Sequence, residues 1–207
     1  HGNTMNKTFA EPLLLKRGQR LKNRLVMAPM GTQQSFFNDV VSPADLAYYR
    51  NRGGDLAAII TGAAQVQING RTMPGMFGVY SDAFLPGLTR LASAIRRNGA
   101  KAILQIFHAG RMTASLDIFG LRTVSASAVA AERPCAELPY ALSDEEVLGV
   151  IADFRQATLR AIEAGFDGIE LHGANTYLIQ QFYSPHSNRR ADRWGGAVNS
   201  ERFRFID

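Results

Sequence analysis

The alternation of short apolar runs with longer amphipathic stretches is the feature that most constrains the fold of this 207-residue chain. Each apolar run is nearly continuous and is cut off by glycine, proline or a polar residue, which is typical of buried strands. The predicted strands are residues 24–30, 56–66, 100–110 and 166–173. Between them, apolar residues at helical spacing predict helices over 42–53, 81–100 and 143–166.

Local signals mark the ends of these predicted helices. Ser42 followed by Pro43 is typical of a helix start, because serine caps the first turn and proline suits its first position. Ser143 with Glu146 three residues later has the pattern of a capping box, and Gly165 marks the end of that helix. The helical stretches are therefore bounded by their own sequence.

Strands that alternate with helices imply right-handed crossovers and a parallel sheet buried on both faces. The first predicted strand and the residues directly after it, RLVMAPMGTQQS, lack the G-x-G-x-x-G of an open dinucleotide-binding sheet. Polar residues instead follow two later strands, with Gln105 and His108 at the third and His172 and Asn175 at the fourth. Because a TIM barrel places its active groups at several strand ends, we predict an α/β fold of the TIM (β/α)8-type, with only about the first four β/α units present.

Composition places the chain among ordinary soluble globular proteins, with 46% hydrophobic and 20% charged residues. No apolar run approaches the roughly 20 residues that span a bilayer, and the N-terminal stretch does not resemble a signal peptide, so a cytoplasmic location without membrane contact is expected. The single Cys135 cannot form an internal disulfide and fits a reducing compartment. The residues before Met5 look like a cloning remnant.

The net charge of +5 raises the question of a nucleic-acid partner. The basic residues gather in residues 15–24 and 188–194, and neither stretch has the interleaved aromatics of a stacking platform. We interpret both as solvated surface and expect no nucleic acid, although an acidic cosubstrate such as a phosphorylated nucleotide is compatible with the charge. His108 and His172 have no carboxylate at ligand spacing, so no metal site is expected.

The polar groups at the fourth strand end suggest a chemistry. His172 and Asn175 can both donate hydrogen bonds, and donors that converge on one carbonyl oxygen stabilise the charge that develops there. Tyr177 has an ordinary pKa near 10 and can serve as a proton donor at neutral pH. A polar strand end can equally be a satisfied structural network, so these residues by themselves leave both interpretations open.

Three blocks of sequence, LKNRLVMAPM, QIFHAGR and HGANTYLIQQFYSPHSNRRADRWGG, resemble those of the Old Yellow Enzyme family of FMN-dependent ene-reductases and NADH:flavin oxidoreductases. The similarity runs from about Leu13 to Asp207. The resemblance implies a TIM barrel with FMN across its mouth. It also implies a flavin-dependent oxidoreductase that passes hydride from NAD(P)H via FMN to the C=C bond of an α,β-unsaturated carbonyl compound.

The resemblance assigns cofactor-binding positions. Pro29 and Met30 match positions whose backbone lies against the flavin ring, and Gly31 stands where many members have a cysteine or threonine that contacts the flavin. Ala63 matches the small residue that lets the flavin approach closely. Gln105 matches the glutamine that hydrogen-bonds the pyrimidine edge of the flavin, for which an amide with donor and acceptor is suited.

The last block carries the roles that the resemblance implies for the substrate. His172 and Asn175 match the pair that binds the substrate carbonyl oxygen, with His172 also counted among the cofactor-binding residues, and Tyr177 matches the proton donor to the α-carbon. Arg190 and Asp192 match positions that we expect to pair and to brace the loop beyond the site.

The chain ends at ERFRFID, the start of a fourth helix, whereas family barrels bind the FMN phosphate with loops after their last two strands. We therefore interpret residues 1–207 as the N-terminal half of an FMN-binding TIM barrel. Four strands leave the first and fourth as open edges with exposed apolar surface. The alternative is a non-catalytic or truncated half-barrel that must assemble, either as a homo-oligomer or with the missing barrel half.

Overall fold

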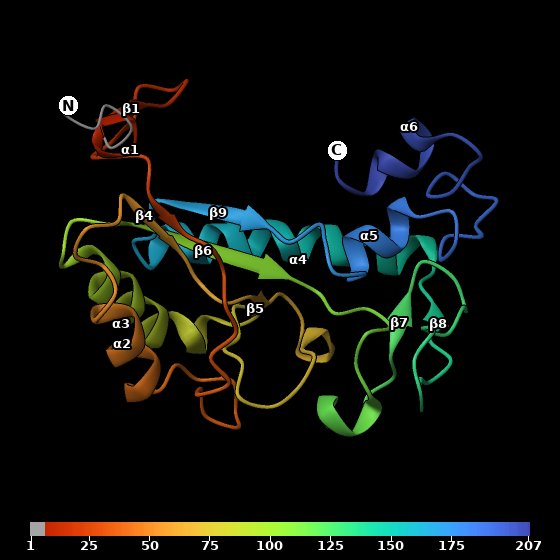
Figure 1. The fold of residues 1–207 in the computed structure, drawn as a ribbon. Coiled ribbons are helices and arrows are strands. Elements are labelled where there is room, and N and C mark those ends of the chain that lie inside the picture. The colour runs from red at the N-terminus through yellow and green to blue at the C-terminus, as the bar shows by residue number, and fades with distance from the viewer. Residues whose placement is uncertain (1–6) are drawn as a thin grey trace.

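A computed structural model describes residues 7–207, so the predicted cloning remnant lies outside the described residues. Its centre is a parallel sheet whose neighbouring strands follow one another along the chain. Three helices accompany the sheet, and the C-terminal elements lie beyond its far end (Figure 1). The strands are β3 (Val26–Met27), β4 (Ala58–Ile60), β5 (Ala64–Gln65), β6 (Lys101–Phe107) and β9 (Gly168–Leu171), and the helices are α2 (Pro43–Arg50), α3 (Leu85–Arg96) and α4 (Asp144–Glu163). This is the predicted fold of four β/α units of a barrel.

The second predicted strand, residues 56–66, is interrupted in the structure. Its first part, β4, pairs with the start of β6, and its second part, β5, pairs with the end of β6. Between them, Thr61 Oγ1 accepts a hydrogen bond from the Gln105 backbone N–H (3.3 Å), and the Tyr49 hydroxyl accepts one from the Gly62 N–H (2.7 Å). Side-chain oxygens thus take backbone donors at the break, which satisfies them without a regular ladder.

Two predicted helix starts are confirmed in detail. Ser42 and Asp45 form a capping box at α2, and Ser143 and Glu146 form the predicted capping box at α4. α4 ends before Gly165, whose φ of 87° lies in the left-handed region that favours glycine. The predicted helix over 81–100 is shorter than expected, because Asp82–Phe84 forms a separate 3₁₀ turn before α3.

The alternation of side chains along β6 separates the core from the opposite face of the sheet. Ala102, Leu104 and Ile106 are buried in one apolar cluster with residues of α3 and α4. Because successive side chains of a strand point to opposite faces, Gln105 and Phe107 project the other way. The face with Gln105 and Phe107 is the interior of the incomplete barrel.

The C-terminal part of the chain forms a second core that the sequence did not reveal. It takes buried residues from β7 (Val124–Ser125), α4 and α5 (Leu178–Tyr183), and β8 (Tyr140–Ala141) and α6 (Asn199–Arg202) are the other elements of this part of the chain. Phe182 and Phe205 stack in parallel with ring centroids 4.1 Å apart, and Trp194 is buried in the same cluster. The remaining short elements are α1 (Lys7–Ala10), β1 (Leu13–Leu14), β2 (Arg20–Leu21) and the 3₁₀ turns Ile68–Gly70, Ser115–Ile118 and Phe203–Phe205.

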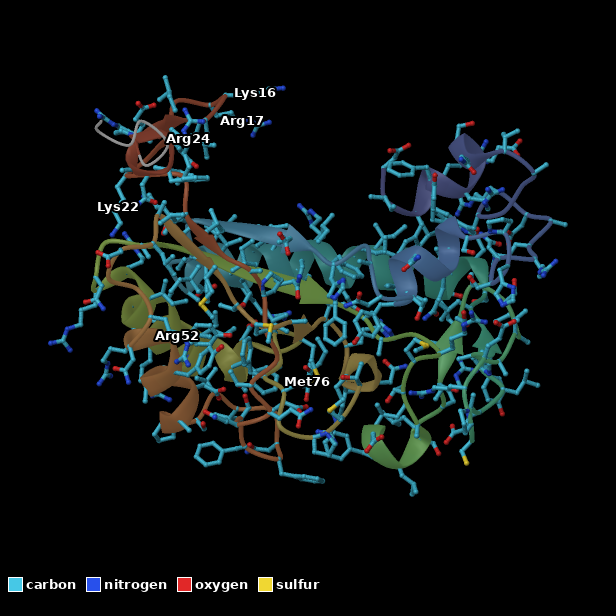
Figure 2. All side chains as sticks on the ribbon, in the orientation of Figure 1. Lys16, Arg17, Lys22, Arg24, Arg52 and Met76 are labelled. Atoms are coloured by element: carbon cyan, nitrogen blue, oxygen red, sulfur yellow. The ribbon has the colours of Figure 1, made fainter. Side chains whose placement is uncertain are left out.

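The two basic stretches differ in their surroundings. Lys16 and Arg17 are exposed in the loop between β1 and β2, at the N-terminal end of the chain (Figure 2). In residues 188–194, however, the Arg190 side chain is only 9% exposed and donates to the carbonyl oxygens of Ala126 and Leu142. The interpretation of this second stretch as solvated surface is therefore wrong for Arg190, because neighbouring carbonyl groups bind its guanidinium.

The sheet has two open edges among the described residues. β3 pairs with β4 alone and β9 with β6 alone, as predicted for the first and fourth strands. The neighbouring apolar side chains of Leu25, Val26 and Leu171 are 42–46% exposed. Within residues 7–207, no helix has the length and apolar character that a membrane crossing requires.

Candidate active site

A cavity of about 510 Å³ lies at the carboxyl ends of the parallel strands. It is lined by residues that follow β3 and β4, by residues at the ends of β6 and β9 and after β9, and by the segment after β5. This is where a barrel gathers side chains from separate strands. The lining residues are Pro29, Gly31, Gln33, Ala63, Thr72, Met73, Met76, Gln105, Phe107, Glu170, Leu171, His172, Gly173, Ala174, Asn175 and Tyr177.

The structure brings together seven of the eight residues singled out from the sequence. Pro29, Gly31, Ala63, Gln105, His172, Asn175 and Tyr177 all line this cavity. Met30 does not, and its side chain is 60% exposed. Its backbone nevertheless lies close to the site, since a Cβ added to Gly62 would sit 2.7 Å from the Met30 carbonyl oxygen.

His172 follows β9 and is held by its own loop. Its Nδ1 accepts a hydrogen bond from the Ala174 backbone N–H at 3.3 Å. In neutral histidine, a ring nitrogen that accepts leaves the proton on the other one, so Nε2 is the donor. Burial lowers the pKa of His172, opposed by the charge of Glu170, and the neutral donor form is therefore favoured at neutral pH.

Asn175 and the next residue, Thr176, both have a left-handed backbone, with φ of 55° and 59°. Two glutamines of α5 hold this unusual turn. Gln180 Oε1 accepts from the Thr176 N–H (2.6 Å), and Gln181 Nε2 donates to the Thr176 carbonyl (2.7 Å). A non-glycine turn of this kind is costly and persists only where its surroundings fix it, which here places Asn175 at the cavity.

Tyr177 lies in an aromatic group with Phe107 and His172. Its ring packs edge-on against Phe107, with centroids 5.1 Å apart, and against His172 at 4.8 Å. Burial raises the pKa of the Tyr177 hydroxyl, opposed by the charge of Arg133. The hydroxyl therefore keeps its proton at neutral pH and is available as a donor.

Gln105 is 5% exposed and is paired with a residue that sequence reasoning missed. Its Nε2 donates to Glu170 Oε1 at 2.7 Å, across the register pair that joins β6 to β9. Glu170 also lines the cavity. The signal was present in the sequence, since Glu170 is a charged residue within an apolar strand and lies two residues before His172, on the same face.

The loop segment after β5 contributes three further lining residues that were not predicted, Thr72, Met73 and Met76. Arg71, directly before them, is fully buried. Its Nη1 lies 2.8 Å from Asp39 Oδ1, and its Nε donates to the Asp117 carbonyl. Loops that follow three different strands are thereby joined at one guanidinium, a connection that no local sequence signal reveals.

His108 has a structural position. Its Nδ1 accepts from the Gly110 N–H (3.0 Å), and its Nε2 lies 3.0 Å from Gln67 Oε1. Burial lowers the pKa of His108 to about 3, so the ring is neutral and both nitrogens are engaged within the protein. Among residues 7–207, no group of three or more His, Cys, Asp and Glu side chains is arranged to hold a metal ion.

The predicted pair of Arg190 and Asp192 is confirmed. Arg190 Nε and Nη2 both donate to the Asp192 carboxylate, at 2.9 and 2.5 Å. Trp194 Nε1 and Arg193 Nη2 donate to the Asp144 carboxylate at 2.7 Å, which connects this loop to the start of α4. These residues brace the loop beyond the site, as expected from the sequence.

The chain is similar to a set of NADH and NADPH oxidoreductases. The sequence model of the NADH:flavin oxidoreductase / NADH oxidase family matches residues 8–207. The NADH:fumarate oxidoreductase of Klebsiella pneumoniae (strain 342) is 48% identical over 98% of this chain and 22% of the relative. The NADH:acrylate oxidoreductase of Vibrio harveyi is 50% identical over 92% of this chain and 19% of the relative.

Solved structures agree with this relationship. Morphinone reductase in complex with tetrahydroNAD has a TM-score of 0.89 and 31% identity, covering 97% of this chain and 58% of that protein. The Old Yellow Enzyme homologue from Zymomonas mobilis has a TM-score of 0.90 and 29% identity, covering 96% and 57%. The chain thus spans a little over half of these proteins and about a fifth of the two curated relatives. It belongs to the NADH:flavin oxidoreductase / NADH oxidase family, and it corresponds to the N-terminal half of the TIM barrel found in Old Yellow Enzyme homologues.

Proposed function

We propose that the chain is part of a flavin-dependent oxidoreductase that passes hydride from NAD(P)H via FMN to the C=C bond of an α,β-unsaturated carbonyl compound. The observation that carries this proposal is the convergence of His172, Asn175 and Tyr177 on the cavity that Gln105 also lines. Membership of the family supports the flavin and the nicotinamide as cofactors. The three polar side chains support the acceptor chemistry.

The cavity fits a flavin ring. Its volume lies within the range of about 300–1,000 Å³ that is usual for small-molecule and cofactor sites. Pro29, Gly31 and Ala63 have small side chains, and Gln105 supplies an amide to the same cavity. FMN, when bound, supplies two-electron hydride chemistry between a reduced nicotinamide and the acceptor.

The residues of the chain have separate tasks in this proposal. His172, through its Nε2–H, and Asn175, through its amide, donate hydrogen bonds to the substrate carbonyl oxygen. Negative charge that develops on this oxygen is stabilised by donors already in place. Tyr177 gives a proton to the α-carbon, and the burial that raises its pKa holds this proton until the carbon becomes basic.

The names of two relatives support the substrate class. Fumarate and acrylate, after which the Klebsiella and Vibrio proteins are named, both contain a C=C bond conjugated with a carboxyl group. Since most of each relative lies outside the matched region, the acceptor must be tested on this chain directly.

The test is the visible absorption spectrum of the size-fractionated protein with added FMN, followed by separate half-reactions. We expect NADH or NADPH to bleach the bound flavin and 2-cyclohexenone or fumarate to restore its colour. In Tyr177→Phe we expect reoxidation by the enone to slow by about 10²- to 10⁴-fold while reduction by the nicotinamide is largely spared. Unchanged reoxidation in Tyr177→Phe, and in a variant with both His172→Ala and Asn175→Ala, would refute the assignment.

A second candidate function is that of a half-barrel whose activity requires assembly. The open edges of β3 and β9 support it, as does the exposed apolar surface at Leu25, Val26 and Leu171. This candidate predicts that the isolated chain elutes as an oligomer, or takes up FMN only after a chain carrying the second barrel half is added. A monomer that binds FMN by itself argues against it.

A further inference from the structure

The pairing of Glu170 with Gln105 goes beyond the roles considered above. The two residues face each other on neighbouring parallel strands and both line the cavity. Gln105 Nε2 donates to Glu170 Oε1 at 2.7 Å. Gln105 is nearly buried, so its amide has few alternative partners.

This contact decides which way the amide of Gln105 faces. The oxygen and nitrogen ends of a glutamine have nearly the same shape, and their hydrogen-bond partners determine which end points where. A carboxylate accepts but does not donate, so Glu170 selects the nitrogen end. The Oε1 of Gln105 is thereby turned away from Glu170, and within residues 7–207 it accepts no hydrogen bond from another protein group.

We propose that Glu170 is a positioning residue that fixes the Gln105 amide with its oxygen available to a ligand in the cavity. The inference rests on the proposed function and deepens it, because it specifies what the flavin edge must offer. Gln105 then requires a ligand edge with an N–H group, such as the imide N–H of the flavin pyrimidine ring. The amide therefore presents its oxygen to the ligand as an acceptor, because one of its two N–H donors is already bound to Glu170.

The first arm of the test needs no cofactor. In ¹H–¹⁵N spectra of the chain without FMN, we expect one hydrogen of the Gln105 side-chain amide to exchange slowly with solvent. Glu170→Ala should abolish this protection. Glu163→Gln, a change at an exposed glutamate at the end of α4, serves as the control and should preserve it. Equal exchange in the wild type and in Glu170→Ala would overturn the inference, whatever the protein does with FMN.

The second arm measures FMN dissociation constants by flavin fluorescence in a double-mutant cycle. Glu170→Gln keeps the shape of the residue but lets either amide turn, and we expect it to weaken FMN binding about tenfold. In a Gln105→Ala background the same change should have little effect, because Glu170 acts through Gln105. A purely structural role of Glu170 would give equal losses in both backgrounds and would contradict the proposal.

The outcomes separate the inference from the proposed function. A protected Gln105 amide in a chain that takes up no FMN, alone or when completed by the second barrel half, would leave the positioning role of Glu170 intact and reject the flavin function. If the Gln105 amide is protected but Glu170→Gln leaves FMN binding unchanged, the proposed flavin function stands and the positioning role of Glu170 is rejected.

Discussion

Arg71→Met tests whether the buried ion pair of Arg71 and Asp39, next in sequence to the cavity-lining Thr72, holds the loops together. The side chains of Arg71 and Asp39 are both 0% exposed, and Nη1 lies 2.8 Å from Oδ1. The guanidinium also lies over the Phe119 ring, 4.0 Å from its centroid. Methionine keeps much of the apolar stem against that ring but removes the charge together with the hydrogen bonds to the Asp117 and Phe37 carbonyls, so the substitution removes the polar contacts and keeps the apolar packing.

The expected cost follows from burial. Removing one partner of a buried ion pair leaves the other charge uncompensated, which typically costs about 3–5 kcal/mol of unfolding free energy. Arg122 is a matched control, since it also has an acidic partner, Glu146, and an aromatic ring, Tyr140, 5.1 Å from its guanidinium. Its side chain is 50% exposed, so Arg122→Met should cost only about 0–1 kcal/mol.

The assay is urea unfolding followed by circular dichroism, analysed by linear extrapolation with the slopes compared between variants. With a slope of about 2 kcal/mol/M, Arg71→Met should lower the midpoint by about 1.5–2.5 M. Adding Asp39→Asn should recover part of the loss, because the unpaired charge is then removed as well. Equal midpoints for Arg71→Met and Arg122→Met, or a further loss in the double variant, would refute the reasoning.

Three other predictions concern stability and use the same assay. The folded-state pKa of His108, about 3, lies below its ordinary value of 6.5, so the unfolded chain takes up this proton first and stability falls as the pH drops from 6.5 towards 3. His108→Gln should flatten this dependence by about 1.4 kcal/mol per pH unit, and an unchanged slope would contradict the assignment. Gly62→Ala should destabilise by about 1–3 kcal/mol, because its Cβ would lie 2.7 Å from the Met30 carbonyl oxygen; a neutral effect would mean that this contact yields readily. Gly149→Ala, in α4 with no atom within 4 Å of the added Cβ, should stabilise by about 0.5–1 kcal/mol, and a loss would be the opposite of this expectation.

Comparison of a helix cap with a strand interruption shows which features short-range sequence patterns can predict. Ser143 and Glu146 could be paired from sequence because a cap involves groups within one turn of helix. The interruption of the strand at Thr61 could not be predicted in this way. The Oγ1 of Thr61 accepts from the Gln105 backbone N–H, 44 residues away, and the N–H of the next residue, Gly62, donates to the Tyr49 hydroxyl. Groups that meet only across the fold leave no periodic pattern in the sequence.

The candidate site likewise contains residues that the sequence identified and residues that only the structure places there. His172, Asn175 and Tyr177 lie within six residues of one another, and Gln105 lies in a strand whose pattern is clear, so sequence blocks were enough to single them out. The burial of Arg190, the pairing of Arg71 with Asp39 and the contribution of Met73 and Met76 to the cavity depend on loops. Loop paths are determined by tertiary contacts rather than by hydrophobic periodicity, which explains why these features were missed.

The sequence by itself determined the order and type of the main strands and helices, because hydrophobic periodicity and capping act over a few residues. It also determined which blocks of sequence resemble those of flavin oxidoreductases. Only the tertiary structure decided that Glu170 Oε1 lies 2.7 Å from Gln105 Nε2 and turns this amide, and that the buried guanidinium of Arg71 joins loops that follow three different strands. The direction of a hydrogen bond and the burial of a charge depend on groups distant in sequence, and folding alone brings these groups together.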